Sequence, residues 1–273
     1  MINLPNEIKE FDKYISSPIV ILEKKNFLNK EFYNKLREAF PKEELMTKKE
    51  SNGLKAALNN SCPTFQKVIS ENEPWKFFYD YLNSKKTVFL FYNLIKKELD
   101  KIEERKKLRK FFFTKAEHSE NRNKLIAKIK RKIVSQFYQN IQLSFEFSII
   151  SNNCYIPPHA DATKSILSWM LYFPDESYKN IDLEKIHSLG TNFYKKKDEL
   201  KDNYINGWEK DKLLSGQDLV LFKDYYKIFY KTKFEENTFY AFIKNDKSWH
   251  DFSAFNFDKD FKRKSININI NLV

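Results

Sequence analysis

Three residues have the types and the spacing of a metal-binding site. His159 and Asp161 stand two residues apart, so in an extended segment their side chains leave the same face. A third candidate ligand, His250, lies far downstream in the segment KSWHDF. Two histidines and one carboxylate form the facial ligand set that suits non-haem Fe(II) and leaves other coordination positions open. The first expectation is therefore that His159, Asp161 and His250 act together as catalytic metal ligands.

The residues around these ligands sharpen the expectation. Pro157-Pro158 stiffens the approach to His159 and excludes a helix there. His250 follows an apolar strand candidate and a short polar turn, where a barrel strand delivers a side chain to the rim. Taken singly, each histidine has a plainer interpretation, His159 as a turn residue and His250 as a core residue beside Trp249. Only the combination of the three predicts a metal site.

The last strand candidate, residues 263–272, has two different faces. Ile and Leu occupy one face, while Arg263, Ser265 and three asparagines occupy the other. Such a polar face is either solvated or, inside a sandwich, in need of partners, because unpaired buried polar groups are costly. An Arg and a Ser two apart on one face together bind a carboxylate, the guanidinium in fork geometry and the hydroxyl as an extra donor.

The elements that position these residues are expected to be β-strands. From about residue 136 the pattern shifts towards a period of two, with the charged insertion 195–216 interrupting it. Many short strands without alternating helices predict an antiparallel sandwich or barrel. The strand candidates are residues 142–150, 166–173, 191–194, 219–222, 238–243 and 263–272.

The first half of the chain is expected to be a largely helical support region, residues 1–141, within a single domain of residues 1–273. Asn29 is a candidate N-cap for a helix that Pro41 ends, and Thr87 is a cap candidate after a break near Ser84. The charged residues 101–135 are interpreted as a helix pair or helical insertion, with a basic contact surface as the alternative. His118, within that stretch, is interpreted as a surface histidine.

Composition limits the class of protein. The chain has 273 residues, of which 16% are aromatic, and this favours a folded protein with a sizeable core. The formal net charge of +12 comes mainly from lysines spread along the chain, so a solvated surface is favoured over a nucleic-acid face. Two cysteines, no signal pattern and no apolar run of ~18 residues predict a cytoplasmic protein with no membrane partner. The oligomeric state is not fixed by the sequence.

Five segments carry a resemblance to a known family. They are PPHAD, SWMLYFPDE, GTNFY, NTFYAFIKNDKSWHDF and RKS, which follow one another over roughly residues 142–273. Together they resemble the Fe(II)- and 2-oxoglutarate-dependent dioxygenase superfamily, on its prolyl-hydroxylase-like branch. The leading PIVILEKKNFLNKEFYNKLREAFP resembles the strand and helix that often precede that core. The resemblance implies a mainly β chain with flanking helices (α+β), built on a double-stranded β-helix of the jelly-roll or cupin-like kind at residues 142–273.

The resemblance also implies roles for the residues named above. By motif match, His159, Asp161 and His250 would hold Fe(II). Arg263 would pair with the distal carboxylate of the cosubstrate 2-oxoglutarate, and Ser265 would assist. O2 would be the second cosubstrate.

Two tyrosines and two lysines complete the candidate site. Tyr172 matches a position where a hydroxyl faces the same carboxylate, and Tyr155 is a weaker candidate for lining the site. The spacing from the second histidine to Arg263 is a few residues longer than usual, which leaves Lys262 or Lys264 open for the arginine's role. The strand phase favours Arg263, because Lys264 would share the isoleucine face.

The implied reaction is hydroxylation of a substrate C–H bond with release of succinate and CO2. Asp161, standing where a halogenase would have a small residue, disfavours a halogenase. The substrate stays open between a small molecule and a peptide, and a hydroxylase of a prolyl or other protein side chain is the second choice within the class. The alternative from another class is a non-catalytic jelly-roll module that binds a metal, or nucleic acid through residues 101–135. Such a module would have no need of Arg263 and Ser265.

Overall fold

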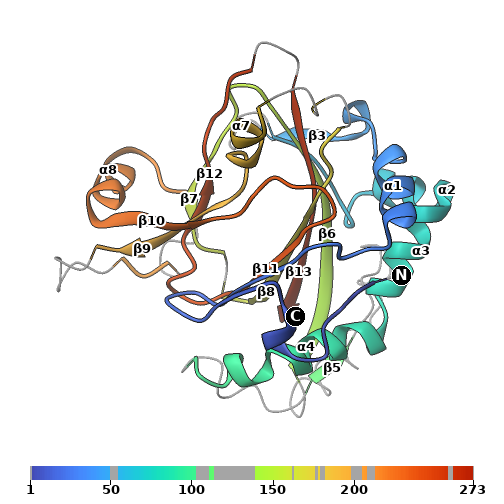
Figure 1. Cartoon of the computed structure of the whole chain (residues 1–273), viewed down its shortest axis with the longest axis horizontal. Helices are drawn as coiled ribbons and strands as arrows, with labels where there is room; N and C mark the ends of the chain where they lie inside the picture. The colour runs from blue at the N-terminus through green and yellow to red at the C-terminus, as the bar shows by residue number, and fades with distance from the viewer. Residues whose placement is uncertain are drawn as a thin grey trace, which may run out of the picture.

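Two β-sheets form the centre of the computed structural model, and helices cover one of them (Figure 1). The structure describes residues 2–49, 55–102, 111–113, 139–161, 163–175, 178, 182–197, 205–207, 213–257 and 261–272. The helices are η1 Ile8–Glu10, α1 Lys30–Glu38, η2 Glu43–Leu45, α2 Pro63–Glu71, α3 Glu73–Leu82, α4 Lys85–Leu99, α7 Leu183–His187 and α8 Gly216–Tyr225. The strands are β1 Lys13–Ile15, β2 Ile21–Lys24, β3 Thr47–Lys49, β4 Lys55–Asn59, β5 Phe111–Phe113, β6 Gln139–Ser151, β7 Ile156–His159, β8 Ser165–Tyr172, β9 Asn192–Lys196, β10 Tyr226–Lys231, β11 Phe239–Ile243, β12 His250–Phe252 and β13 Lys262–Leu272.

The strand order defines the fold. The larger sheet has the order β1-β2-β11-β8-β13-β6-β4-β3, with β5 parallel to β6, and the smaller sheet has the order β10-β9-β12-β7. In the half that begins at β6, the first, eighth, third and sixth strands therefore pair in one sheet, and the second, seventh, fourth and fifth pair in the other. The neighbours within this core are antiparallel. This interleaved order is that of a jelly roll, so the predicted double-stranded β-helix with flanking helices is confirmed.

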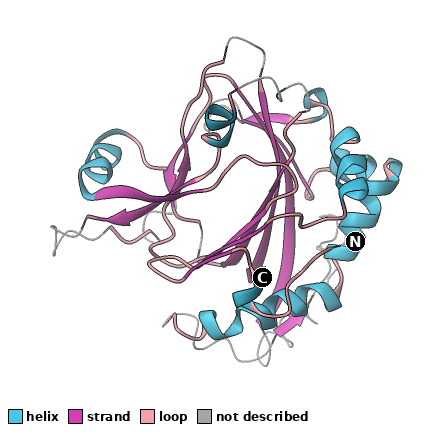
Figure 2. Ribbon diagram, in the orientation of Figure 1, coloured by secondary structure: helices cyan, strands magenta, loops and turns pink. Residues whose placement is uncertain are grey.

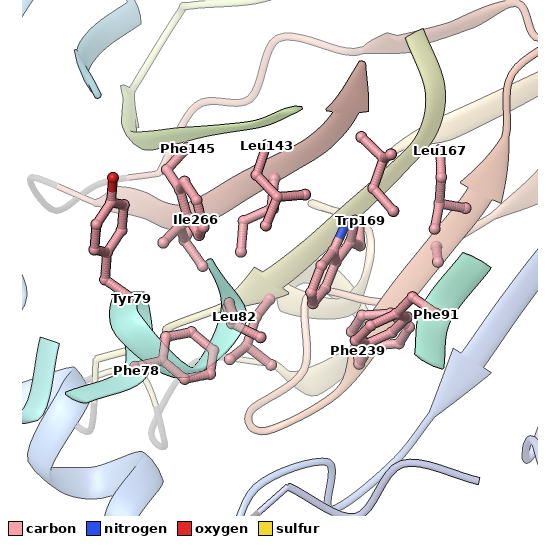
Figure 3. Packing of buried hydrophobic residues seen from close by; sticks show 14 of the residues in the cluster. Phe78, Tyr79, Leu82, Phe91, Leu143, Phe145, Leu167, Trp169, Phe239 and Ile266 are labelled. Atoms are coloured by element: carbon pink, nitrogen blue, oxygen red, sulfur yellow. The ribbon is translucent and has the colours of Figure 1, made fainter. Parts of the chain in front are cut away.

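The outer face of the larger sheet is a packed aromatic core. The face of β6 that carries Phe145 and Phe147 meets α3, where Trp75 lies edge-on to Phe147 with ring centroids 4.6 Å apart. The ring centroids of Phe91 of α4 and Trp169 of β8 lie 4.2 Å apart. Figure 3 shows this layer, with the helix side chains pressed against those of β6, β8 and β13. Burial of these rings provides the main hydrophobic stabilisation of the fold.

The N-terminal helices begin where the sequence predicts. Asn29 caps α1, its side chain accepting hydrogen bonds from the backbone N–H groups of Glu31 and Phe32. A break before α4 also occurs as predicted, but the cap is Ser84, whose hydroxyl accepts from the N–H of Thr87. Figure 2 shows these helices along one side of the large sheet. They pack against one face of the larger sheet, and the other face is left for the candidate site.

One predicted strand is wrong. Residues 219–222 belong to α8, not to a strand, because this short apolar run packs Phe222 against Trp249 and Tyr226 at ring distances of 4.9 Å and 4.4 Å. A run of four apolar residues has no periodicity that separates a strand from a buried helix face. The sequence analysis also missed β7, β10 and β12. β7 contains both prolines and lies at the edge of the smaller sheet, where a missing N–H is tolerated.

Other expectations are settled in part. Most of residues 101–135, His118 included, lie outside the described residues. Both cysteines are free thiols, Cys62 partly buried and Cys154 buried. In the part of the chain that the structure describes, no helix combines the length and the apolar character needed to cross a membrane.

Candidate functional site

The fold brings His159, Asp161 and His250 together. β7 and β12 are neighbours in the smaller sheet, and His250 stands opposite His159 in their register. Asp161 follows β7 by two residues, and the three side chains each offer a ligand atom within 4.8 Å of the others. The imidazole centroids of the two histidines lie 4.2 Å apart. The HxD spacing therefore brings His159 and Asp161 to the same place, because β7 is extended up to its last residue.

Backbone carbonyls orient both histidine rings. His159 Nδ1 lies 2.9 Å from the carbonyl oxygen of Pro157, and His250 Nδ1 lies 2.9 Å from that of Ser248. A carbonyl only accepts hydrogen bonds, so each Nδ1 carries the proton and each Nε2 keeps its lone pair. His250 Nε2 is 3.6 Å from Asp161 Oδ2. This is the outer-shell arrangement that fixes a histidine for metal binding through Nε2.

The protonation states also suit a metal. Burial lowers the pKa of His159, and burial together with the neighbouring His159 lowers the pKa of His250 to about 3. Burial alone would raise the pKa of Asp161, but the Lys244 ammonium and the two histidines hold it well below its usual range. Two neutral imidazoles and one carboxylate are the deprotonated forms that a divalent metal requires. The donor set therefore fits Fe(II), with His159, Asp161 and His250 as its ligands.

Lys244 is a neighbour of the triad that the sequence analysis missed. It follows β11, and its Nζ forms an ion pair with Asp161 Oδ2. The lysine side chain is 1% exposed, so the charge pair is shielded from water on the lysine side. Lys244 is one of many lysines in the sequence, and only the tertiary fold singles it out. In this structure it supplies the positive charge that the Asp161 carboxylate needs.

A cavity of about 140 Å³ joins the triad to Arg263. Its wall includes all three candidate ligands together with Arg263 and Thr191. Arg263 is 4% exposed; its Nε donates to the carbonyl of Leu189 at 2.7 Å and its Nη2 lies 3.5 Å from the Thr191 hydroxyl. Within the described residues, no carboxylate forms an ion pair with it. A buried cation without an anion is costly, which marks this end of the cavity as an anion site.

Aromatic rings pack against the Arg263 guanidinium. Its central carbon lies 4.4 Å from the Phe252 ring centroid and 4.7 Å from that of Tyr172. Burial lowers the pKa of Arg263, but an arginine remains charged at any ordinary pH. The alternative lysines point elsewhere, since Lys262 pairs with Glu43 at 2.9 Å and Lys264 with Asp175 at 2.7 Å. Of these three basic side chains, only the arginine reaches the cavity.

Tyr172 and Ser265 lie behind the arginine. The Tyr172 hydroxyl is hydrogen-bonded to the hydroxyls of Thr191 at 3.1 Å and Thr232 at 3.0 Å. Ser265 is fully buried, and its hydroxyl has no hydrogen-bond partner among the described residues. Tyr155 is 48% exposed, and neither it nor Tyr172 nor Ser265 is among the described residues that line the cavity. The structure therefore places Tyr172 against Arg263, with Ser265 opposite Tyr172 in the strand register, and leaves Tyr155 at the surface.

Further residues of the cavity were not singled out from the sequence. Lys55 of β4 and Glu146 of β6 form an ion pair across its wall, and the buried Ser148 hydroxyl has no partner among the described residues. Two of them had a usable signal. In the segment QLSFEFS, polar residues alternate with apolar ones, which places Glu146 and Ser148 on one polar face. No comparable signal marks Lys55.

Comparisons with known proteins were made for sequence and for structure. No protein-family model and no curated protein matches the chain. A prolyl-4-hydroxylase from Pseudomonas putida is similar in structure, with a TM-score of 0.47 and 9% identity over 93% of this chain and 92% of that one. The non-haem α-ketoglutarate-dependent carbocyclase SnoK from nogalamycin biosynthesis is also similar in structure. Its TM-score is 0.48, with 7% identity over 98% of this chain and 84% of that one.

A third similar structure is EvdO2 from Micromonospora carbonacea var. aurantiaca, solved in complex with 2-oxoglutarate. It gives a TM-score of 0.41 and 10% identity over 99% of this chain and 93% of that one. The assignment of the fold rests on the strand order described above, and the function is argued from the site. The chain therefore has a jelly-roll core that carries a His-Asp-His cluster suited to a metal.

Proposed function

We propose that the chain is an Fe(II)- and 2-oxoglutarate-dependent dioxygenase that hydroxylates a C–H bond of its substrate. The observation that carries the proposal is Arg263, a buried guanidinium without an acidic partner among the described residues, in the same cavity as the triad. A metal-binding module alone has no use for such a cation. A dicarboxylate that reaches from the metal to Arg263 accounts for both ends of the cavity.

Each group has a defined task in this proposal. His159, Asp161 and His250 would hold the iron, with the imidazole Nδ1 protons kept on the carbonyls of Pro157 and Ser248. Arg263 would bind the distal carboxylate through its fork of N–H donors. Iron at this site, together with 2-oxoglutarate and O2, would supply the oxidising chemistry, whose products would be succinate, CO2 and a hydroxylated substrate. The residues of the cavity would position these components and exclude water from them.

The polar residues behind Arg263 would tune carboxylate binding. Tyr172 shields one face of the guanidinium, and its hydroxyl fixes Thr191, which lines the cavity. The unpaired hydroxyls of Ser148 and Ser265 are donors without acceptors among the described residues. Buried polar groups of this kind are normally satisfied, so a polar ligand or ordered water is expected near Ser148, which lines the cavity; Ser265 is not among the residues that line it.

Succinate formation tests the proposal. Protein purified without oxygen is given Fe(II), ascorbate, 2-oxoglutarate and air, and we expect slow succinate release in the absence of a prime substrate. His159→Ala should abolish it, whereas His187→Ala on α7, outside the cavity wall, should retain it. Arg263→Met should weaken 2-oxoglutarate binding about 10- to 100-fold, the loss expected for hydrogen bonds to a charged group, and Arg263→Lys should restore part of the affinity.

Two outcomes would contradict the proposal. If the iron-loaded protein neither forms succinate nor binds 2-oxoglutarate, the dioxygenase proposal is wrong. A jelly roll that binds a metal without oxygenase chemistry would then remain. If Arg263→Met binds 2-oxoglutarate as tightly as the unaltered chain, Arg263 does not bind the distal carboxylate, and the observation that carries the proposal is lost.

A further inference from the structure

A second and larger hollow opens from the triad cavity. Its volume is about 700 Å³, and it shares Glu146, Asp161 and Asn269 with the smaller cavity. A hollow of this size suits a small molecule. Because Asp161 is a candidate iron ligand, a molecule in this hollow would lie directly beside the metal site. The larger hollow is therefore the place for the substrate to be oxidised.

The wall of this hollow is polar but mostly uncharged. It is formed by the inner faces of β6 and β13 and by the turn after β4. In the register, Asn269 stands opposite Ser144, and Asn271 opposite Gln142. The side-chain amides and hydroxyls of the wall belong to Asn59, Asn60, Ser61, Gln142, Ser144, Asn269 and Asn271.

Many of these polar groups are held in place by bonds on the wall itself. The Asn271 amide donates to the Ser144 hydroxyl at 3.0 Å and accepts from Ser165 at 2.6 Å. The Asn60 side chain accepts from the backbone N–H of Phe145 at 3.1 Å. Such fixed amides form a preorganised array of donors and acceptors. In contrast, the Oδ1 of Asn269 is buried and has no hydrogen-bond partner among the described residues, while the residue itself lines the hollow.

The charges on the described wall are largely neutralised. Glu146 pairs with Lys55, and Asp161 pairs with Lys244. Lys164 is the further charged residue of the wall. A cationic substrate would therefore find no free acid among the described residues of the wall, because both acids already have lysine partners, and Lys164 would repel it. These charges disfavour a cationic ligand and admit a neutral one.

The apolar residues of the wall are Leu143, Phe145 and Leu272, and they offer little surface to an aromatic or lipid substrate. Leu272 is partly buried and packs against the main core. Phe145 and Leu143 are each 1% exposed and belong to the aromatic core on the opposite face of β6. Phe145 lies 4.7 Å from Tyr79 of α3, which Figure 3 shows on the helix side of the sheet. Recognition of a nucleobase or a flat apolar molecule needs exposed rings or apolar side chains. The described wall therefore favours hydrogen bonding over stacking.

We propose that the substrate is a neutral, polyhydroxylated small molecule of the carbohydrate class. This inference rests on the proposed function for the oxidation itself, while the binding site stands on its own. Sugar hydroxyls both donate and accept, which matches a wall of amides and hydroxyls that includes Asn269. A peptide also offers donors and acceptors, but its apolar side chains would find little exposed apolar surface on the described wall, and its basic side chains would find no free acid.

Binding is tested first, without turnover. Calorimetry of the Fe(II)- and 2-oxoglutarate-loaded protein under nitrogen would use maltose, sucrose and N-acetyl-D-glucosamine as probes. Thymidine, laurate and the blocked peptide acetyl-Gly-Pro-Gly-amide would represent the other classes. We expect at least one sugar to bind and the others to fail. Asn269→Leu should weaken that sugar about tenfold, as expected for one lost hydrogen bond, and Asn93→Leu on the exposed side of α4 should not.

Turnover then separates the two proposals. Admission of air should raise succinate release above the substrate-free rate with the sugar that binds. Succinate release without binding of any sugar overturns the carbohydrate inference and leaves the dioxygenase. Binding of the peptide or thymidine in place of a sugar overturns it in the same way. Sugar binding with neither succinate release nor 2-oxoglutarate binding retains the binding site and overturns the proposed function.

Discussion

The two faces of the larger sheet differ in what they contribute. On β13, Ile266, Ile268 and Ile270 pack under the helices, while Arg263, Ser265 and three asparagines face the other way. The outer face is a close-packed aromatic layer without a charge at its centre. The inner face carries buried polar atoms without partners among the described residues, including those of Ser148 and Ser265. The core that stabilises the fold and the candidate site therefore lie on opposite faces of the same strands.

The largest stability effect should come from the outer face. Phe147 is fully buried against Trp75, Phe40 and Phe65. Phe147→Ala should lower the free energy of unfolding by about 3–5 kcal/mol, because it removes a buried ring and leaves a cavity. Its neighbour Ser148 points to the inner face, so Ser148→Ala should change the same quantity by less than about 0.5 kcal/mol. Urea unfolding measures both, and equal losses would show that the two faces do not differ as described.

An effect of intermediate size on stability is expected when Lys244 is replaced. Lys244→Met leaves the partly buried Asp161 carboxylate without its cation, and the metal-free protein should lose about 1–3 kcal/mol of unfolding free energy. Mn²⁺, a redox-quiet substitute for Fe(II), should then raise the melting temperature more in the variant than in the unaltered chain, because the metal replaces the lost charge. Lys244→Arg should behave like the original. An equal Mn²⁺ shift in all three proteins would show that Lys244 does not neutralise Asp161.

The smallest expected effect is a loss of unfolding free energy as the pH falls. The pKa of His250 is about 3 in the folded chain, below the ordinary value of 6.5, since burial and the neighbouring His159 disfavour its charged form. The unfolded chain therefore takes up protons first as the pH falls below about 6.5. Metal-free protein should lose about 1–2 kcal/mol of unfolding free energy between pH 7 and pH 5 from this residue. Asp161 stays ionised across that window, because its pKa is lowered.

The control for this prediction is His250→Gln, compared with the unaltered chain by urea unfolding at both pH values. The variant should lose less stability than the original on acidification. A variant with the same pH dependence would show that His250 does not stay neutral inside the fold.

The sequence predicted those parts of the site that depend on local spacing. The HxD pair works because an extended segment places alternate side chains on one face, and Arg263 was separated from Lys264 by the same rule. Lys244 could not be found, because its role depends on a contact with Asp161 across the fold. The same is true of Lys55, whose pairing with Glu146 depends on the register of β4 and β6.

The fold was predicted less completely than its class. The long strands β6, β8 and β13 have clear alternation, so they were recognised. β12 is three residues long and begins with a metal-ligand candidate, and β7 contains two prolines, so neither has a strand pattern. Both form because the rest of the jelly roll supplies partners. The helix at residues 216–225 was misread for the opposite reason, since four adjacent apolar residues imitate a strand.

The position of β7 has a consequence for self-association. An exposed edge strand normally invites pairing with another chain and thereby aggregation. β7 ends the smaller sheet, and two of its four residues are prolines, which have no N–H to donate to an incoming strand. The carbonyl of Pro158 already accepts from the N–H of Leu214 at 3.0 Å. The sheet edge that carries His159 therefore offers few N–H and C=O groups for pairing with a strand of another chain, so aggregation through this edge is disfavoured.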